Sequence, residues 1–144
     1  SVGVAVDASK SATVTTVKVL DGDVWLGENT TVTTVYATGG TIRQQCASTT
    51  TEINGATVRT VGTGTIGTLN VYNGLARPDS TGTITTANLY GGTIDASLSK
   101  ASRTITTLNV LGQSSGDVRT DPDGVTISTL NLPSDRAFSF SVTS

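Results

Sequence analysis

The sequence lacks several residue types on which catalysis and metal binding depend. Its 144 residues include no histidine, no methionine and a single cysteine, Cys46. Without histidine there can be no Ser-His-Asp or Cys-His arrangement, no HExxH zinc site and no other histidine metal ligand. A single cysteine also excludes an internal disulfide, and we expect Cys46 to be a small buried hydrophobe. We therefore predict a protein that is not an enzyme and holds no metal or cofactor.

Charge is sparse and evenly spread. Nine basic and 11 acidic residues give a formal net charge of −2, and neither sign is concentrated in one segment. This excludes the basic patches that bind nucleic acid or acidic membranes. No apolar run approaches the roughly 18 residues of a membrane-spanning helix, and no signal peptide is visible. We expect a soluble protein with neither nucleic acid nor membrane as partner.

Close acidic pairs are confined to turns. Asp21 and Asp23 lie in LDGD, and Asp121 and Asp123 lie in TDPDG. Aspartate and glycine are typical turn residues. We interpret both pairs as turn formers rather than as a carboxylate catalytic pair or a calcium site.

Threonine and glycine are abundant where aromatic residues are few. The chain has 29 threonines and 16 glycines but only six aromatic residues, so its interior must consist of Val, Ile, Leu and Ala. This composition favours strands over helices.

A short motif repeats along the chain. Its seven copies are VTTVKVLDGDVW from Val14, VTTVYATGGTIR from Val32, STTTEINGATVR from Ser48, IGTLNVYNGLAR from Ile66, ITTANLYGGTID from Ile84, ITTLNVLGQ from Ile105 and ISTLNLP from Ile127. Successive copies start 18, 16, 18, 18, 21 and 22 residues apart. This period is too short for helical repeats and is typical of one turn of a β-solenoid.

Within one copy, the apolar residues are unevenly spaced. In the fifth copy, Ile84, Ala87, Leu89 and Ile94 follow one another at steps of three, two and five residues. Steps of two indicate strands, and irregular steps indicate bends. We expect corners at Thr85-Thr86 and at Gly91-Gly92, where glycine permits a positive φ.

The fold predicted is therefore all-β: a single-domain parallel β-helix of about seven coils of 16–22 residues, right-handed. Residues 1–12 would form a partial N-terminal coil or cap, 13–133 the β-helix, and 134–144 a C-terminal strand that acts as a cap or as a contact with another chain. Like residues would stack in columns about 4.8 Å apart. The third copy is the weak point, because Ser48 and Thr51 stand where its neighbours have aliphatic residues.

Two polar ladders follow from the same alignment. The second threonine of the motif recurs in every copy, at Thr16, Thr34, Thr50, Thr68, Thr86, Thr107 and Thr129. Asparagines recur between the inward residues of the middle strand, at Asn70, Asn88, Asn109 and Asn131. We interpret both as structural, because stacked hydroxyls and amides stabilise strands. An ice-binding or glycan-binding threonine array would need a flat outward surface, which a corner does not offer.

Two further features are candidate contact surfaces. Trp25, Arg43, Arg59 and Arg77 occupy equivalent positions in successive copies, and Asp95 follows them. Stacked arginines repel one another unless an acidic partner relieves them, so this row could dock on a partner or could be merely solvated. The final RAFSFSVTS alternates Phe138, Phe140 and Val142 with polar residues, so this strand could cap the last coil or pair with another chain.

The repeats resemble a known group of proteins. TLNVYNG at 68–74, TITTANLYGGTID at 83–95 and ASRTITTLNVLG at 101–112 are similar to the coils of Thr- and Gly-rich β-helical virion proteins of tailed bacteriophages. The resemblance implies a structural protein located in the virion, at the capsid surface. It would be a capsid decoration protein bound to the major capsid protein or other virion proteins, and it would form a homo-oligomer such as a trimer. The alternatives are a tail spike or fibre, or a receptor- or glycan-binding β-helix module. Few aromatic residues are available for sugar stacking.

Overall fold

The computed structural model describes residues 2–4, 10–97, 102–111, 117–120, 124–132 and 139–142. These residues form strands and connecting turns, with no helix. No segment of the described ranges is a helix long and apolar enough to cross a membrane. The strands are β1 (Val2–Val4), β2 (Ala12–Val19), β3 (Asp23–Leu26), β4 (Thr30–Ala37), β5 (Thr41–Gln44), β6 (Ala47–Thr60), β7 (Ile66–Pro78), β8 (Ile84–Leu89), β9 (Thr93–Ala96), β10 (Arg103–Val110), β11 (Asp117–Thr120), β12 (Val125–Asn131) and β13 (Ser139–Val142).

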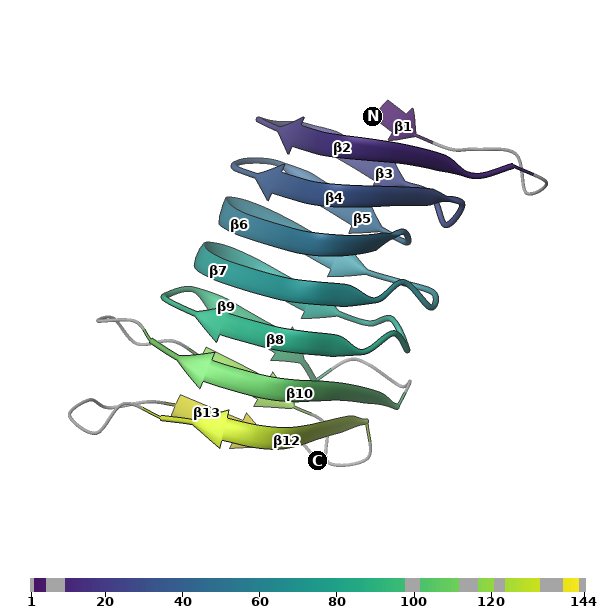
Figure 1. Cartoon of the computed structure of the whole chain (residues 1–144). Coiled ribbons are helices and arrows are strands. Elements are labelled where there is room, and N and C mark those ends of the chain that lie inside the picture. Colours follow the sequence, from purple (N-terminus) through teal and green to yellow (C-terminus); the bar gives the residue numbers. More distant parts are fainter. Residues whose placement is uncertain are drawn as a thin grey trace.

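The strands form two parallel stacks that face each other across the core (Figure 1). The first sheet runs β2-β4-β6-β7-β8-β10-β12. The second sheet runs β1-β3-β5-β6-β7-β9-β11-β13. The long strands β6 and β7 belong to both, since the chain bends from one sheet to the other without leaving the extended conformation.

The chain is a right-handed parallel β-helix, as predicted from the repeat. In Figure 1 it runs from right to left along the near sheet, passes to the far sheet, returns to the right and steps down by one coil. This sense of rotation and advance defines a right-handed coil. Seven stacked strands in the first sheet correspond to six coil-to-coil steps.

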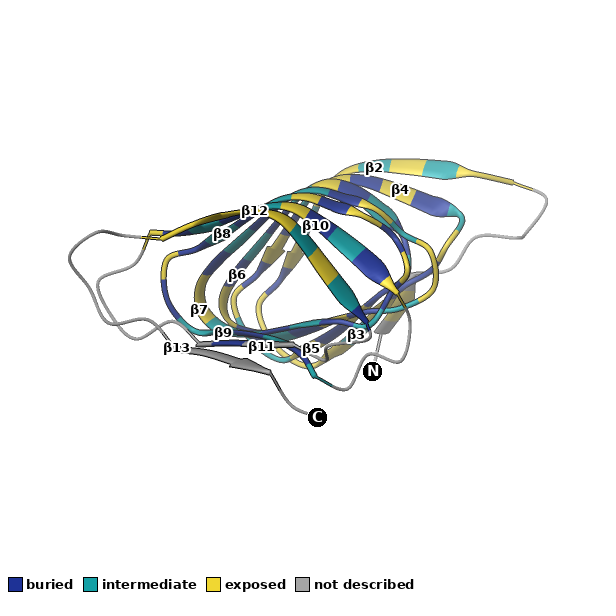
Figure 2. Ribbon diagram, turned by 90° about the horizontal axis from the view of Figure 1, so that it is seen from below, coloured by how far each residue is buried: buried dark blue, intermediate teal, exposed yellow. Residues whose placement is uncertain are grey.

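The core consists of columns of residues in register between the two sheets (Figure 2). The first core column is Val14, Val32, Ser48, Ile66, Ile84, Ile105 and Ile127, and the second is Val17, Val35, Thr51, Leu69, Ala87, Leu108 and Leu130. From β4 to β10 their aliphatic members are at most 2% exposed. These columns follow the predicted alignment, because the spacing of apolar residues fixes which side chains point inward.

Glycine forms the predicted second corner. Gly22, Gly40, Gly55, Gly74 and Gly92 take up one position per coil, all with positive φ between 73° and 103°. The first corner differs from expectation, because Thr85 and Thr86 lie inside the continuous strand β8. Threonine is a strong strand former, so the chain bends here without interrupting the strand.

Burial decreases toward both ends of the stack. In the last coil Leu130 is 39% exposed, and Leu132, which follows the end of β12, is 54% exposed. At the same end, β13 pairs in parallel with β11 of its own chain. At the other end, β1 pairs with β3, so the N-terminal residues contribute a strand to the first coil.

Candidate binding surfaces

The arginine row lies on the second sheet. Trp25, Arg43, Arg59 and Arg77 are neighbours in register on β3, β5, β6 and β7. They point outward because the residues on either side of them in each strand, such as Ile42 and Val58, are core residues. Trp25 is 45% exposed at one end of the row.

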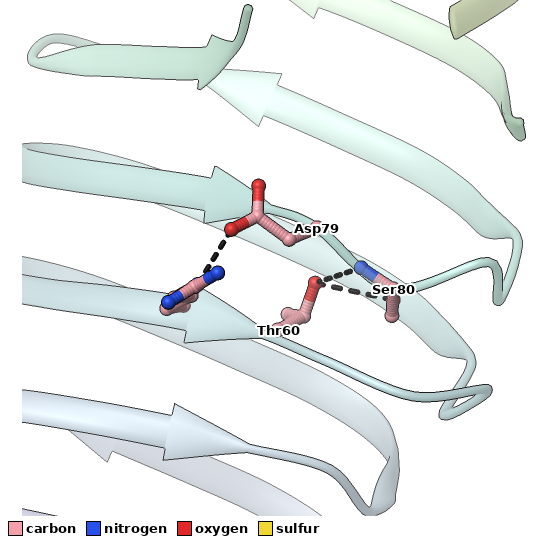
Figure 3. A network of polar contacts seen from close by, with 4 residues as sticks. Thr60, Asp79 and Ser80 are labelled. Atoms are coloured by element: carbon pink, nitrogen blue, oxygen red, sulfur yellow. Dashed lines mark hydrogen bonds and ion pairs between the residues drawn. The ribbon is translucent and has the colours of Figure 1, made fainter. Parts of the chain in front are cut away.

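One carboxylate lies beside this row. Asp79, in the turn after β7, accepts a hydrogen bond from Nε of Arg59 at 2.5 Å, which is also an ion pair (Figure 3). The Asp79 side chain is only 9% exposed, whereas that of Arg59 is 51% exposed. Within the described ranges Arg43 has no acidic partner, and Nε of Arg77 is buried without a hydrogen bond. The row therefore keeps net positive charge.

The turn that carries Asp79 is fixed by hydrogen bonds to Thr60 on the preceding coil. The Ser80 hydroxyl donates to Oγ1 of Thr60 at 3.1 Å, one coil earlier (Figure 3). The backbone N–H of Asp79 donates to the carbonyl of Thr60 at 3.1 Å. These contacts hold the carboxylate over Arg59.

Asp95 continues the position of the row in β9, where its register partner on the next coil is Arg119. Its Oδ1 accepts hydrogen bonds from the backbone N–H of Ser97 at 3.1 Å and from the Ser97 hydroxyl at 2.5 Å. Asp95 is thus engaged by its own turn, and the run of arginines ends at Arg77.

The four asparagines lie in register on the first sheet and bond to one another. Each amide donates to the Oδ1 of the asparagine one coil earlier, at 2.9 Å from Asn88 to Asn70, 2.8 Å from Asn109 to Asn88 and 2.7 Å from Asn131 to Asn109. The ladder threonines Thr16, Thr34, Thr50, Thr68, Thr86, Thr107 and Thr129 are also register partners. Amides bound in this way tie successive coils together.

Tyrosines gather at one margin of the same sheet. Tyr72 and Tyr90, one coil apart, stack with ring centroids 4.7 Å apart and an interplanar angle of 11°. The pKa of Tyr72 is raised by desolvation and then by the nearby Glu52, Tyr90 and Tyr36. Tyr36, Tyr72 and Tyr90 are each 37–41% exposed. The sequence offered a signal for this pair, since Tyr72 and Tyr90 are one repeat apart.

Two buried polar features were not expected from the sequence. In the third coil, Gln44, Ser48 and Thr51 form a closed ring of hydrogen bonds of 2.9–3.2 Å. Arg103 is 2% exposed, and none of its three side-chain nitrogens has a hydrogen-bond partner among the described residues. Ser48 and Thr51 stand where neighbouring coils have aliphatic residues, and Arg103 stands where preceding coils have mostly small residues, which are the signals that could have revealed them.

The proposed C-terminal contact lies mostly beyond the described side chains. Phe138 is outside the described residues, as are Asp121 and Asp123. Phe140 lies in β13, whose backbone is paired with β11.

Comparisons with protein-family models, with curated proteins and with solved structures found no match to this chain. At the level of class, the chain is a parallel β-helix that carries the arginine row on one sheet and the asparagine and threonine ladders on the other.

Proposed function

We propose that this chain is a virion structural protein, a capsid decoration protein that docks on the capsid lattice through the arginine row. The observation that carries the proposal is this in-register row on a rigid solenoid, with Asp79 neutralising one of its three arginines. The proposed location in a virion rests on the resemblance of the repeats to β-helical phage virion proteins.

The row is suited to an acidic protein surface. Arg43, Arg59 and Arg77 come from neighbouring strands, which lie about 4.8 Å apart, and guanidinium forms paired hydrogen bonds with carboxylates. Trp25 adds an exposed aromatic side chain at the end of the row, and tryptophan and arginine are the residues that most often dominate binding energy. The partner would be the major capsid protein or another virion protein with carboxylates on its outer surface.

The proposal includes assembly as a homo-oligomer, for example a trimer. The first and last strands of both sheets lie at the ends of the stacks, where unpaired backbone groups can bond to another chain. The C-terminal strand with Phe140 lies at such an end. Sedimentation of the purified chain tests this part, and a monomer at all concentrations would contradict it.

Copy counting in purified virions tests the location. Quantitative mass spectrometry should find hundreds of copies per particle if the chain decorates the capsid. A handful of copies would instead support a spike or fibre, and absence from the particle would reject the virion proposal altogether.

Charge reversal tests the surface. Arg43→Glu with Arg59→Glu should abolish rebinding to capsids that lack the protein, because like charges would then face each other. Lys10→Glu with Lys18→Glu changes the net charge equally away from the row and should leave rebinding unchanged. Equal binding by both double variants would exclude the arginine row as the docking surface.

One observation favours the second candidate, a tail-spike, fibre or receptor- and glycan-binding module. Three of the exposed aromatic residues, Tyr36, Tyr72 and Tyr90, lie on one face, and aromatic rings are common sugar contacts. Against it, Tyr72 and Tyr90 stack on each other and so cover one ring face each. Glycan-array binding that is lost in Tyr36→Ala would favour this candidate.

A further inference from the structure

The outward side of the first sheet carries a second, denser set of threonines. In every coil, the residues directly before and directly after the first core column point away from the core. Threonine occupies eleven of these fourteen positions, six before the column and five after it. The exceptions are Ala47, Gly67 and Ser128. We call this surface the threonine face.

The threonine face is exposed and its hydroxyls are free. All its threonines except Thr104 are exposed, and Thr104 is half-buried. Among the described residues none of these eleven hydroxyls bonds to another protein group. Threonines elsewhere in the chain, such as Thr38, Thr60 and Thr81, do take part in hydrogen bonds through their hydroxyls. The free hydroxyls are thus available to a ligand.

Strand propensity alone does not account for this surface. The outward side of the second sheet is also built of exposed strand positions, and there Asp23, Arg43 and Arg59 stand beside the threonines. None of the fourteen positions of the threonine face is charged, and the charged residues Lys18 and Glu52 lie further along the same sheet. Protein surfaces normally carry interspersed charges of both signs. A face without charge is complementary to an uncharged surface.

The backbone places these side chains in a two-dimensional net. Along the stack the spacing is that of parallel strands, about 4.8 Å, and the register pairs Thr13 with Thr31 and Thr104 with Thr126. In a straight strand two successive outward residues are about 6.7 Å apart, twice the rise per residue. β-Branching restricts the χ1 rotamers of threonine, so its methyl and hydroxyl groups hold fixed positions.

We propose that the threonine face binds the surface of ice. Ice presents water oxygens in rectangular nets with spacings close to those of this face, it is uncharged, and it both donates and accepts hydrogen bonds. Ordered methyl groups would hold water between the rows, and the free hydroxyls would join that water to the crystal. An uncharged array repeated over several coils fits an extended crystal better than a single small ligand.

The twist of the solenoid limits how strongly the threonine face is expected to bind ice. Figure 2 shows successive strands of the first sheet turning gradually relative to one another, so the net matches a planar lattice over neighbouring coils rather than over all seven. The expected activity is therefore adsorption to ice and inhibition of ice recrystallisation, with little depression of the freezing point. This inference does not depend on the proposed role in a virion.

The test is adsorption of the purified full chain to a growing ice hemisphere, together with a recrystallisation assay. The wild-type chain should concentrate in the ice fraction and keep ice grains small. Thr33→Lys with Thr85→Lys should abolish both effects, because two long charged side chains hold the crystal away. Thr41→Lys with Thr93→Lys, on the outward side of the second sheet, is the matched control and should retain both.

A gain-of-function variant sharpens the test. Ala47→Thr fills a gap between Thr31 and Thr65 and should strengthen recrystallisation inhibition. Gly67 is not suitable, because a Cβ there would lie 2.6 Å from the carbonyl oxygen of Thr49. Circular dichroism of each variant establishes that the fold is kept.

Three outcomes would overturn the proposal. They are exclusion of the folded wild-type chain from ice, equal activity of the Thr33/Thr85 and Thr41/Thr93 variants, and binding to crystalline cellulose or chitin with no adsorption to ice. None of them bears on the arginine row, so the proposed virion role is tested separately.

Discussion

Arg103 lies where other coils place mostly small residues. The equivalent positions, two residues before the first core column, hold Ala12, Thr30, Cys46, Gly64 and Gly82 in the preceding coils. Burial lowers the pKa of Arg103 to about 10, an effect that nearby Asp79 partly offsets. The folded state thus holds a charged group that would be better solvated in the unfolded chain.

Replacing Arg103 with methionine should stabilise the protein. Arg103→Met keeps an unbranched side chain of similar reach and removes the buried charge, so the free energy of unfolding at pH 7 should rise by about 1–3 kcal/mol. Urea unfolding measures the difference.

The folded-state pKa is the lower one, so the unfolded state binds more protons between about pH 10 and the ordinary arginine pKa. The free energy of unfolding of the wild-type chain therefore rises with pH in that window. Below the window, the wild-type chain is less stable than the variant by the full difference. A less stable variant at pH 7 would show that Arg103 has a stabilising partner.

The ring of Gln44, Ser48 and Thr51 differs from Arg103, because each buried polar side chain in the ring has a hydrogen-bond partner. Thr51→Val leaves Ser48 and Gln44 with unmade hydrogen bonds and should lower the free energy of unfolding by about 1–3 kcal/mol. The triple variant Gln44→Leu, Ser48→Val, Thr51→Val removes the whole ring and should recover most of the loss. Urea unfolding of both variants distinguishes a satisfied network from three independent contacts.

At the scale of the element, the glycine corner depends on both backbone angle and space. Gly22 and Gly40 share positive φ, at 84° and 73°. A Cβ on Gly40 would lie 2.1 Å from the carbonyl oxygen of Gly22, whereas a Cβ on Gly22, in the first corner, meets nothing within 4 Å. At Gly40 the second corner stacks directly on the backbone of the first, whereas the first corner has room for a side chain at Gly22.

The two glycines form a matched pair for mutation. Gly22→Ala should cost only the strain of a left-handed backbone, about 1–2 kcal/mol. Gly40→Ala should cost clearly more, because the coils must also move apart. Thermal and urea unfolding of the two variants provide the comparison, and equal losses would mean that stacking at the corner is not tight.

At the scale of the whole molecule, the middle coils are the best protected. Core residues from β4 to β10 are almost fully buried, while those of β2 and β12 are partly exposed. In a solenoid each coil contacts only its neighbours, so opening should begin at the ends. Cys46 lies in the third coil and is 1% exposed.

Cys46 therefore reports opening of the stack. Burial raises the pKa of its thiol to about 11, so little thiolate exists at pH 8 and a disulfide reagent should react very slowly with the native chain. Reaction should become fast in denaturing urea, and the native rate should increase in the destabilised Gly40→Ala variant. Rapid labelling of the native wild-type chain would show that the middle coils open readily.

The sequence by itself determined the coil. Its period, the unequal steps between Ile84, Ala87, Leu89 and Ile94, and the glycine in six of the seven copies specify which residues face inward and where the chain turns. This is possible because side-chain direction in a strand follows from residue number alone. The asparagine positions were visible for the same reason.

Only the tertiary structure decided the side-chain contacts that depend on turns of unequal length. The pairing of Asp79 with Arg59, the ring in the third coil and the unpartnered guanidinium of Arg103 depend on where loops from neighbouring coils come to rest. It also showed that the threonine bend stays within a continuous strand, so the residues around the first core column form one open face. A repeat defines each coil, but the contacts between coils and the exposure of their faces arise only when the coils are stacked.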